Sequence, residues 1–133
     1  PWISYGSDTL LFHPDQSEKM QFRIENNIPE KAFVIIYAGK LDESKGGLLL
    51  AEALQNKFEA DRSVVFVVVG NTSGEYGRKV EEKFSISENK IIRFPTQRYV
   101  DLAHFYKGAD LALFPRQCSL SFYDVQACGL PVI

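Results

Sequence analysis

The sequence predicts an α/β protein built on a doubly wound parallel sheet. Short apolar runs rich in β-branched and aromatic residues alternate with segments whose apolar residues recur at helical spacing, which is the pattern of βαβ units. The run at 64–69 is continuously apolar rather than alternating, as expected for a strand buried on both faces of a sheet. Because crossovers between parallel strands are right-handed, few strand orders remain, and we expect the order 3-2-1-4-5.

The expected strands end at glycine or proline. Gly39 and Gly70 follow the first two runs, and Pro115 stops the fourth because it cannot donate to a ladder. In the order 3-2-1-4-5 the first and fourth strands lie side by side, and ligands of such sheets bind outside the carboxyl ends there. The strands are expected at 33–38, 64–69, 91–94 and 111–114, with the start of a fifth at 131–133.

The expected helices carry apolar residues on one face. Asp15 and Glu18 have capping-box spacing at the start of the first helix. The clearest apolar stripe is formed by Leu102, Phe105 and Tyr106, since the second and third lie three and four positions after the first. The helices are expected at 16–26, at 45–58, from 74 through the stripe of 76, 80 and 84, at 102–109 and at 121–128.

Composition narrows the classes of protein. The 133 residues suit one domain. A net charge of −2 gives no support to a general nucleic-acid-binding surface. No apolar run approaches the roughly 18 residues that a membrane span needs. Cys118 and Cys128 fit neither a disulfide framework nor a metal spacing, which suits a reducing compartment. No group of carboxylates or histidines has metal-ligand spacing either, and we expect no metal and no cofactor.

The two ends of the sequence indicate a piece of a longer protein. Pro1 stands where a complete chain has methionine, and 129–133 have the pattern of a turn running into a strand. Residues 1–14 are irregular and are expected to be a lead-in. We therefore expect 15–133 to be one domain truncated at its C-terminal end.

The loop after the first strand is the first candidate binding segment. Gly39 lets a ligand approach the backbone, and Lys40 and Lys45 flank the turn. Two ammonium groups there can hold a diphosphate, whereas a solvated loop with two surface lysines explains the same spacing. The segment matches neither the Walker loop nor the G-x-G-x-x-G fingerprint.

The segment after the fourth strand is the second candidate. Ser119 and Ser121 are candidate caps of a helix whose N–H groups face the switch point. Asp124 lies one turn into that helix and can accept hydrogen bonds from hydroxyl groups. The alternative is that Asp124 only complements the helix dipole.

The histidines and cysteines carry weaker signals. His13 and His104 have no catalytic partner in the sequence, and His104 is expected at the surface. Cys118 lies near the second segment and Cys128 is expected in the core, with no histidine beside either.

Four segments of the sequence resemble motifs that occur together in one family. Residues 39–46 resemble that family's G-R-L-x-x-x-K-G signature, and residues 124–133 resemble its E-A-x-A-x-G-x-P-V-I ending. Residues 3–14 resemble its N-G-V-D-x-x-x-F-x-P lead-in, and residues 106–115 resemble its Y-x-x-A-D-x-x-V-x-P stretch. The order and spacing agree over essentially the whole chain, which therefore resembles the family 4 glycosyltransferases, the glycosyl transferases group 1.

The resemblance implies half of a GT-B enzyme, the architecture in which two Rossmann-like domains face a cleft. Residues 1–14 would join the domains, and 15–133 would be the domain that binds a nucleotide-sugar. Catalytic roles at the donor diphosphate fall on Lys40 and Lys45, and the ribose role on Asp124. Residues 95–98 would lie near the base. The implied donor-binding residues are Gly39, Lys40, Lys45, Ser119, Leu120, Ser121 and Asp124.

The sequence departs from the family pattern at three places. Lys40 replaces arginine and loses bidentate phosphate geometry, and Asp124 is shorter than the family's glutamate. The family has an acid that contacts the donor sugar eight positions before the ribose residue. Counting back from Asp124 reaches Arg116, and aligning from Pro115 reaches Ser119, and neither is an acid.

The expected function is donor binding in a retaining glycosyltransferase that moves a sugar from a nucleoside-diphosphate sugar to an acceptor. The sequence does not identify the acceptor, for which a carbohydrate or a lipid-linked glycan is the expected class. The isolated chain is expected to be inactive, and the full protein to be cytoplasmic or peripheral at a membrane. A non-catalytic nucleotide-binding or interaction module, which the missing acid favours, and a nucleotide-sugar epimerase stay open as alternatives.

Overall fold

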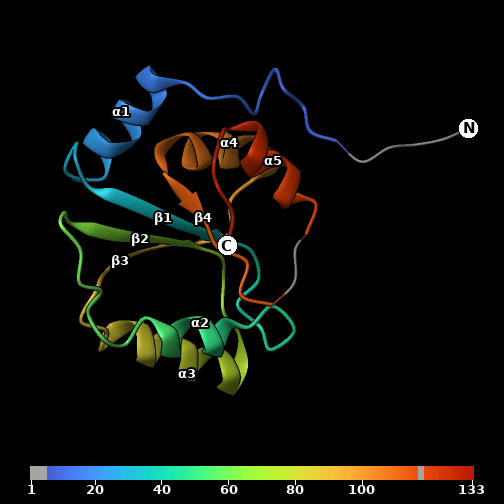
Figure 1. Cartoon of the computed structure of the whole chain (residues 1–133). Coiled ribbons are helices and arrows are strands. Elements are labelled where there is room, and N and C mark those ends of the chain that lie inside the picture. The colour runs from blue at the N-terminus through green and yellow to red at the C-terminus, as the bar shows by residue number, and fades with distance from the viewer. Residues whose placement is uncertain (1–5, 117–118) are drawn as a thin grey trace, which may run out of the picture.

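The computed structural model, which describes residues 6–116 and 119–133, places one parallel sheet between two layers of helices (Figure 1). The strands lie in the order β3-β2-β1-β4. Val132 forms an isolated parallel bridge with Ala112, at the place expected for a fifth strand. The predicted fold class is therefore confirmed, with four strands in the expected order. Their bounds are β1 (Phe33–Ala38), β2 (Val64–Val69), β3 (Lys90–Phe94) and β4 (Leu111–Ala112).

The helices divide between the two faces of the sheet as right-handed winding requires (Figure 1). One face carries α1 (Gln16–Glu25), α4 (Tyr99–Gly108) and α5 (Ser121–Ala127). The other carries α2 (Gly47–Ala53) and α3 (Gly74–Ser85). In the described part of the chain, no helix is long and apolar enough to cross a membrane.

The core lies on both faces because strand residues alternate in direction. Val34 and Ile36 face the cluster under α1, α4 and α5, which also contains Phe12 and Phe22. Tyr37 lies one position after Ile36, so its side chain faces the opposite cluster under α2 and α3. Continuous apolar runs are therefore needed in β1 and β2, since each of their two faces is buried.

The helix expected at 45–58 is shorter at both ends. Gly46 adopts a left-handed φ of 78°, so the helix begins one residue later. At the other end, the carbonyl of Leu54 accepts from the side chains of Ser87 and Asn89. These contacts hold the chain in a loop where the sequence pattern predicted another turn of helix. The fourth strand, expected at 111–114, ends at Ala112. Beyond it, the N–H of Leu113 donates to the Ile36 carbonyl and the N–H of Phe114 donates to the Ile133 carbonyl.

A buried ion cluster fastens α1 to the start of β4. The two carboxylate oxygens of Asp110 accept from Lys19 at 2.6 Å and from Arg23 at 2.8 Å. The backbone N–H of Val34 donates to the same group at 2.8 Å. Burial alone would raise the pKa of Asp110, but the hydrogen bonds from Lys19, Val34 and Arg23 lower it below its ordinary value.

Candidate functional site

The loops that follow β1 and β4 touch each other at the carboxyl edge of the sheet. The guanidinium of Arg116 donates to the backbone oxygen of Glu43 at 3.1 Å. A Cβ added at Gly46 would lie 3.1 Å from Arg116 Cγ and 3.3 Å from Pro115 Cβ. That close approach and the left-handed φ of Gly46 both favour glycine, and the two segments selected from the sequence meet at one edge of the molecule.

A cavity of about 280 Å³ lies at this edge, and we call it the switch-point cavity. Its floor is formed by the ends of β1 and β2, where Gly70 passes so close to Gly39 that a Cβ would lie 1.9 Å from the Gly39 oxygen. The cavity is lined by Ala38, Gly39, Lys40, Val69, Gly70, Thr96, Gln97, Leu102, Tyr106, Ser119 and Ser121. Residues of both candidate segments thus share one cavity. Thr96 and Gln97 belong to the stretch expected near the base.

The two lysines of the first segment differ in their placement. Lys40 lines the switch-point cavity and also a second cavity of about 530 Å³ beside it, toward α3. Lys45 lies half-buried in the same loop, and neither cavity includes it. Asp42 organises this loop by accepting from the hydroxyl of Ser44 at 2.7 Å and from the Lys45 N–H at 3.0 Å. These bonds, followed by the charges of both lysines, lower the pKa of Asp42.

Asp124 is buried, with 5% of its surface exposed, in the first turn of α5. Its Oδ1 accepts from the hydroxyl of Ser7 at 2.6 Å and from the hydroxyl of Tyr99 at 3.4 Å. The carboxylate therefore does not point into solvent, and its partners come from the lead-in and from α4. Asp124 does not line the switch-point cavity. Tyr106 does line it, and the negative charge of Asp124 raises the pKa of Tyr106.

Two serine hydroxyls at the start of α5 form a hydrogen-bonded pair. Ser119 Oγ and Ser121 Oγ are hydrogen-bonded to each other, and both line the switch-point cavity. The N–H of Ser121 also faces Ser119 Oγ at 3.3 Å. Leu120 is the N-cap residue and is 63% exposed, outside the cavity.

Sequence reasoning missed three groups at this edge. Tyr106 belongs to an apolar helical stripe, which made it indistinguishable from an ordinary core residue. Tyr99 and Ser7 approach Asp124 only through the fold, since Ser7 is 117 positions away in sequence. The aromatic character of the stripe was a usable signal for Tyr106, whereas no pattern in the sequence indicates the Ser7 contact.

The histidines and cysteines lie away from the cavity where the structure describes them. His104 is partly exposed and faces Glu25 at 3.0 Å, in agreement with a surface position. Cys128 is buried, and burial raises its pKa to about 11, which makes it a poor nucleophile. Cys118 lies outside the described residues. Among residues 6–116 and 119–133, no three His, Cys, Asp or Glu side chains gather as a metal-ligand set.

Comparison with known proteins gives the same assignment along the whole chain. Residues 32–133 match the family model described as glycosyl transferases group 1. The D-inositol 3-phosphate glycosyltransferase 1 of Catenulispora acidiphila is 29% identical over 96% of this chain and 33% of that protein. The lipopolysaccharide 1,2-N-acetylglucosaminetransferase of Salmonella typhimurium is 31% identical over 97% of this chain and 36% of that protein. The structure of Anabaena HepE in complex with UDP and glucose matches with a TM-score of 0.72 and 19% identity, over 96% of this chain and 35% of HepE.

The strand order and the cavity at the switch point define a doubly wound α/β domain of the ligand-binding class. Within that class, the family match over residues 32–133 is decisive. The chain belongs to the glycosyl transferases group 1 family. It spans about a third of the length of the relatives that it matches.

Proposed function

We propose that this chain is the donor-binding domain of a retaining glycosyltransferase that takes its sugar from a nucleoside-diphosphate sugar. The observation that carries the proposal is the switch-point cavity, where Lys40 from the first family motif meets Ser119 and Ser121 from the segment before the last motif. Family membership supplies the class of reaction, and the cavity supplies a place for the donor.

The chemistry asked of the site is electrostatic. A nucleoside diphosphate leaves with negative charge on its oxygens, and fixed cationic and hydrogen-bonding groups lower the energy of that charge as it develops. Lys40 lines the cavity and Lys45 belongs to the same loop, and we assign both ammonium groups to one diphosphate. The hydroxyls of Ser119 and Ser121 add neutral donors, and we assign the ribose hydroxyls to Asp124.

The rest of the proposal concerns the whole protein. We propose an N-terminal domain that binds a carbohydrate or lipid-linked glycan acceptor, joined through the lead-in that ends at Pro14. The same proposal puts the enzyme in the cytoplasm or at the inner membrane surface. The isolated chain is expected to bind nucleotide weakly and to transfer no sugar, because the acceptor site belongs to the other domain.

The test is nucleotide titration of three lysine variants. We expect Lys40→Ala and Lys45→Ala each to weaken UDP binding about tenfold, the order of one hydrogen bond between charged partners. Lys31→Ala is the matched control, because Lys31 is exposed and precedes β1 at the opposite edge of the sheet. Unchanged UDP affinity in both loop variants, measured by calorimetry, would remove the diphosphate site.

A non-catalytic nucleotide-binding module on the same fold is the second candidate. It is favoured by the absence of an acid at both positions aligned with the family's sugar-contacting acid, which are Arg116 and Ser119. Hydrolysis of a nucleotide-sugar by the full-length protein separates the two candidates, since a binding module releases no sugar.

A further inference from the structure

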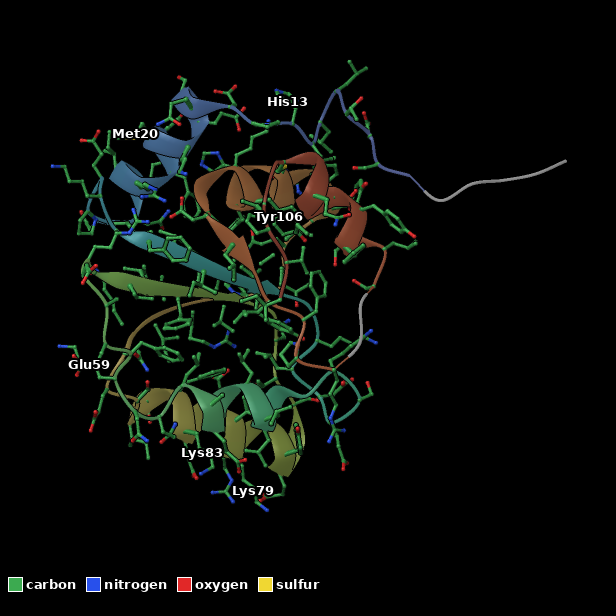
Figure 2. All side chains as sticks on the ribbon, viewed as in Figure 1. His13, Met20, Glu59, Lys79, Lys83 and Tyr106 are labelled. Carbon is green, nitrogen blue, oxygen red and sulfur yellow. The ribbon has the colours of Figure 1, made fainter. Side chains whose placement is uncertain are left out.

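The hydroxyl of Tyr106 is the unusual group in this site. Tyr106 lies in the last turn of α4 (Figure 2). It is 1% exposed, and the centroid of its ring lies 5.9 Å from that of Phe12. Among the residues that the structure describes, its oxygen is the buried side-chain polar atom that has no hydrogen-bond partner. A buried hydroxyl without a partner is unfavourable, so its presence calls for a reason.

Tyr106 carries a proton that it can donate. Burial is the main cause that raises its pKa above the ordinary 10.0, and the negative charge of Asp124 adds to this shift. Tyr106 and Ser121 line the same cavity, and Ser121 lowers the pKa of Tyr106, opposite in sense to burial. Ser121 Oγ is hydrogen-bonded to Ser119 Oγ, and the Tyr106 hydroxyl has no partner in hydrogen-bonding geometry among the residues that the structure describes.

The proton inventory of the three hydroxyls changes when an anion arrives. Each serine has one proton, and one of these two protons is used between Ser119 and Ser121. A phosphate oxygen only accepts hydrogen bonds, so a diphosphate that places an oxygen near each serine turns both protons toward it and breaks the bond between the serines. Both lone pairs of the Ser121 oxygen are then open to the phenol of Tyr106, whose hydroxyl has no partner among the residues that the structure describes.

We propose that Tyr106 is a positioning residue for the diphosphate, donating to Ser121 so that Ser121 donates to a phosphate oxygen. This inference rests on the proposed donor-binding function. In the resulting chain each donor polarises the next, which strengthens the outer bond to the anion. The Tyr106 hydroxyl thus gains a partner when the diphosphate binds, and no proton is transferred.

The experiment compares nucleotide affinity with stability in the same variants of the chain. We expect Tyr106→Phe to weaken binding of UDP and of inorganic pyrophosphate about two- to tenfold, the net effect of one neutral hydrogen bond. We expect its urea midpoint to be unchanged or higher, because the variant removes a buried group that lacks a partner. Ser87→Ala is the control, since its hydroxyl donates to the Leu54 carbonyl at the opposite edge, and it should lose stability while keeping UDP affinity.

A double-variant cycle identifies the route through Ser121. In the Ser121→Ala background, Tyr106→Phe should have no further effect on UDP affinity. An equal effect in both backgrounds, unchanged UDP affinity in Tyr106→Phe, or a stability loss as large as that of Ser87→Ala would each overturn the proposal. If the unaltered chain binds no UDP, the proposed function itself fails; if it binds UDP and Tyr106→Phe binds equally, only the role of Tyr106 fails.

Discussion

Asp124→Asn separates the ribose role of this carboxylate from a purely structural one. The substitution keeps the size of the side chain and its Oδ1 acceptor, so the hydroxyls of Ser7 and Tyr99 retain a partner. It removes the negative charge. On the proposed function, ribose hydroxyls donate to that charge, and the change tests whether they do.

The magnitude follows from the two kinds of contact. Hydrogen bonds to a charged group contribute about 1.5–3 kcal/mol, so we expect UDP binding to weaken by about ten- to a hundredfold. The charge lies in the first turn of α5, where its interaction with the helix dipole contributes about 0.3–1 kcal/mol. The hydrogen bond from Ser7 also changes from a charged to a neutral acceptor, which costs about 1 kcal/mol more. The free energy of unfolding should therefore fall by no more than about 2 kcal/mol.

Calorimetry with UDP and 2′-deoxy-UDP, beside urea unfolding, measures both quantities. The deoxy nucleotide should bind the unaltered chain more weakly than UDP, and the difference should nearly vanish in Asp124→Asn. Glu75→Gln is the matched control, because Glu75 is an exposed acid in the first turn of α3. Lost stability with intact UDP affinity would refute the reasoning and make Asp124 a helix-terminus residue.

Three further outcomes are expected. Ser7→Ala should tighten UDP binding about two- to tenfold, because it removes the hydroxyl that donates to Oδ1 of Asp124, and weaker binding would contradict this competition. Asp110→Asn should lower the free energy of unfolding by about 2–4 kcal/mol, since it leaves the buried Arg23 without its charged partner. The pKa of Asp110 is lowered in the folded chain, so this stabilisation is complete above the unfolded pKa of about 3.8 and is lost as the pH falls further. The difference in the free energy of unfolding between Asp110→Asn and the unaltered chain, measured in urea, should therefore shrink at about pH 3. UDP-glucose should bind no more than about threefold tighter than UDP, because neither Arg116 nor Ser119 offers an acid to the sugar, and a larger preference measured by calorimetry would show that another group contacts it.

The sheet was predictable because its information is local. The apolar runs of β1 and β2 are six residues each, and glycine follows both, so pattern and punctuation agree. The order of the strands then followed from handedness alone. Failures occurred where long-range contacts decide, as at the end of α2, where Asn89 takes the Leu54 carbonyl and replaces a helical turn by a loop.

The site was predictable in its position but not in its contacts. Motif spacing selected Lys40 and Ser121, and both line the switch-point cavity. The hydrogen bond from Ser7 to Asp124 and the unpartnered hydroxyl of Tyr106 depend on side-chain placement across three elements. Helical periodicity reports that Tyr106 is buried, but it does not report whether a buried oxygen has a partner.

The contacts of Arg116 and Ser119 favour Ser119 as the position that aligns with the family's sugar-contacting acid. Arg116 ties the two loops together through the Glu43 carbonyl and through its approach to Gly46. Ser119 lines the cavity, and its hydroxyl forms part of the pair that we assign to the diphosphate. A neutral hydroxyl thus stands where the family has an acid, beside groups that can still hold a phosphate. Binding of the nucleotide and turnover of its sugar are therefore separable in this site, and ligands that differ only in the sugar carry the information that distinguishes an enzyme from a binding module.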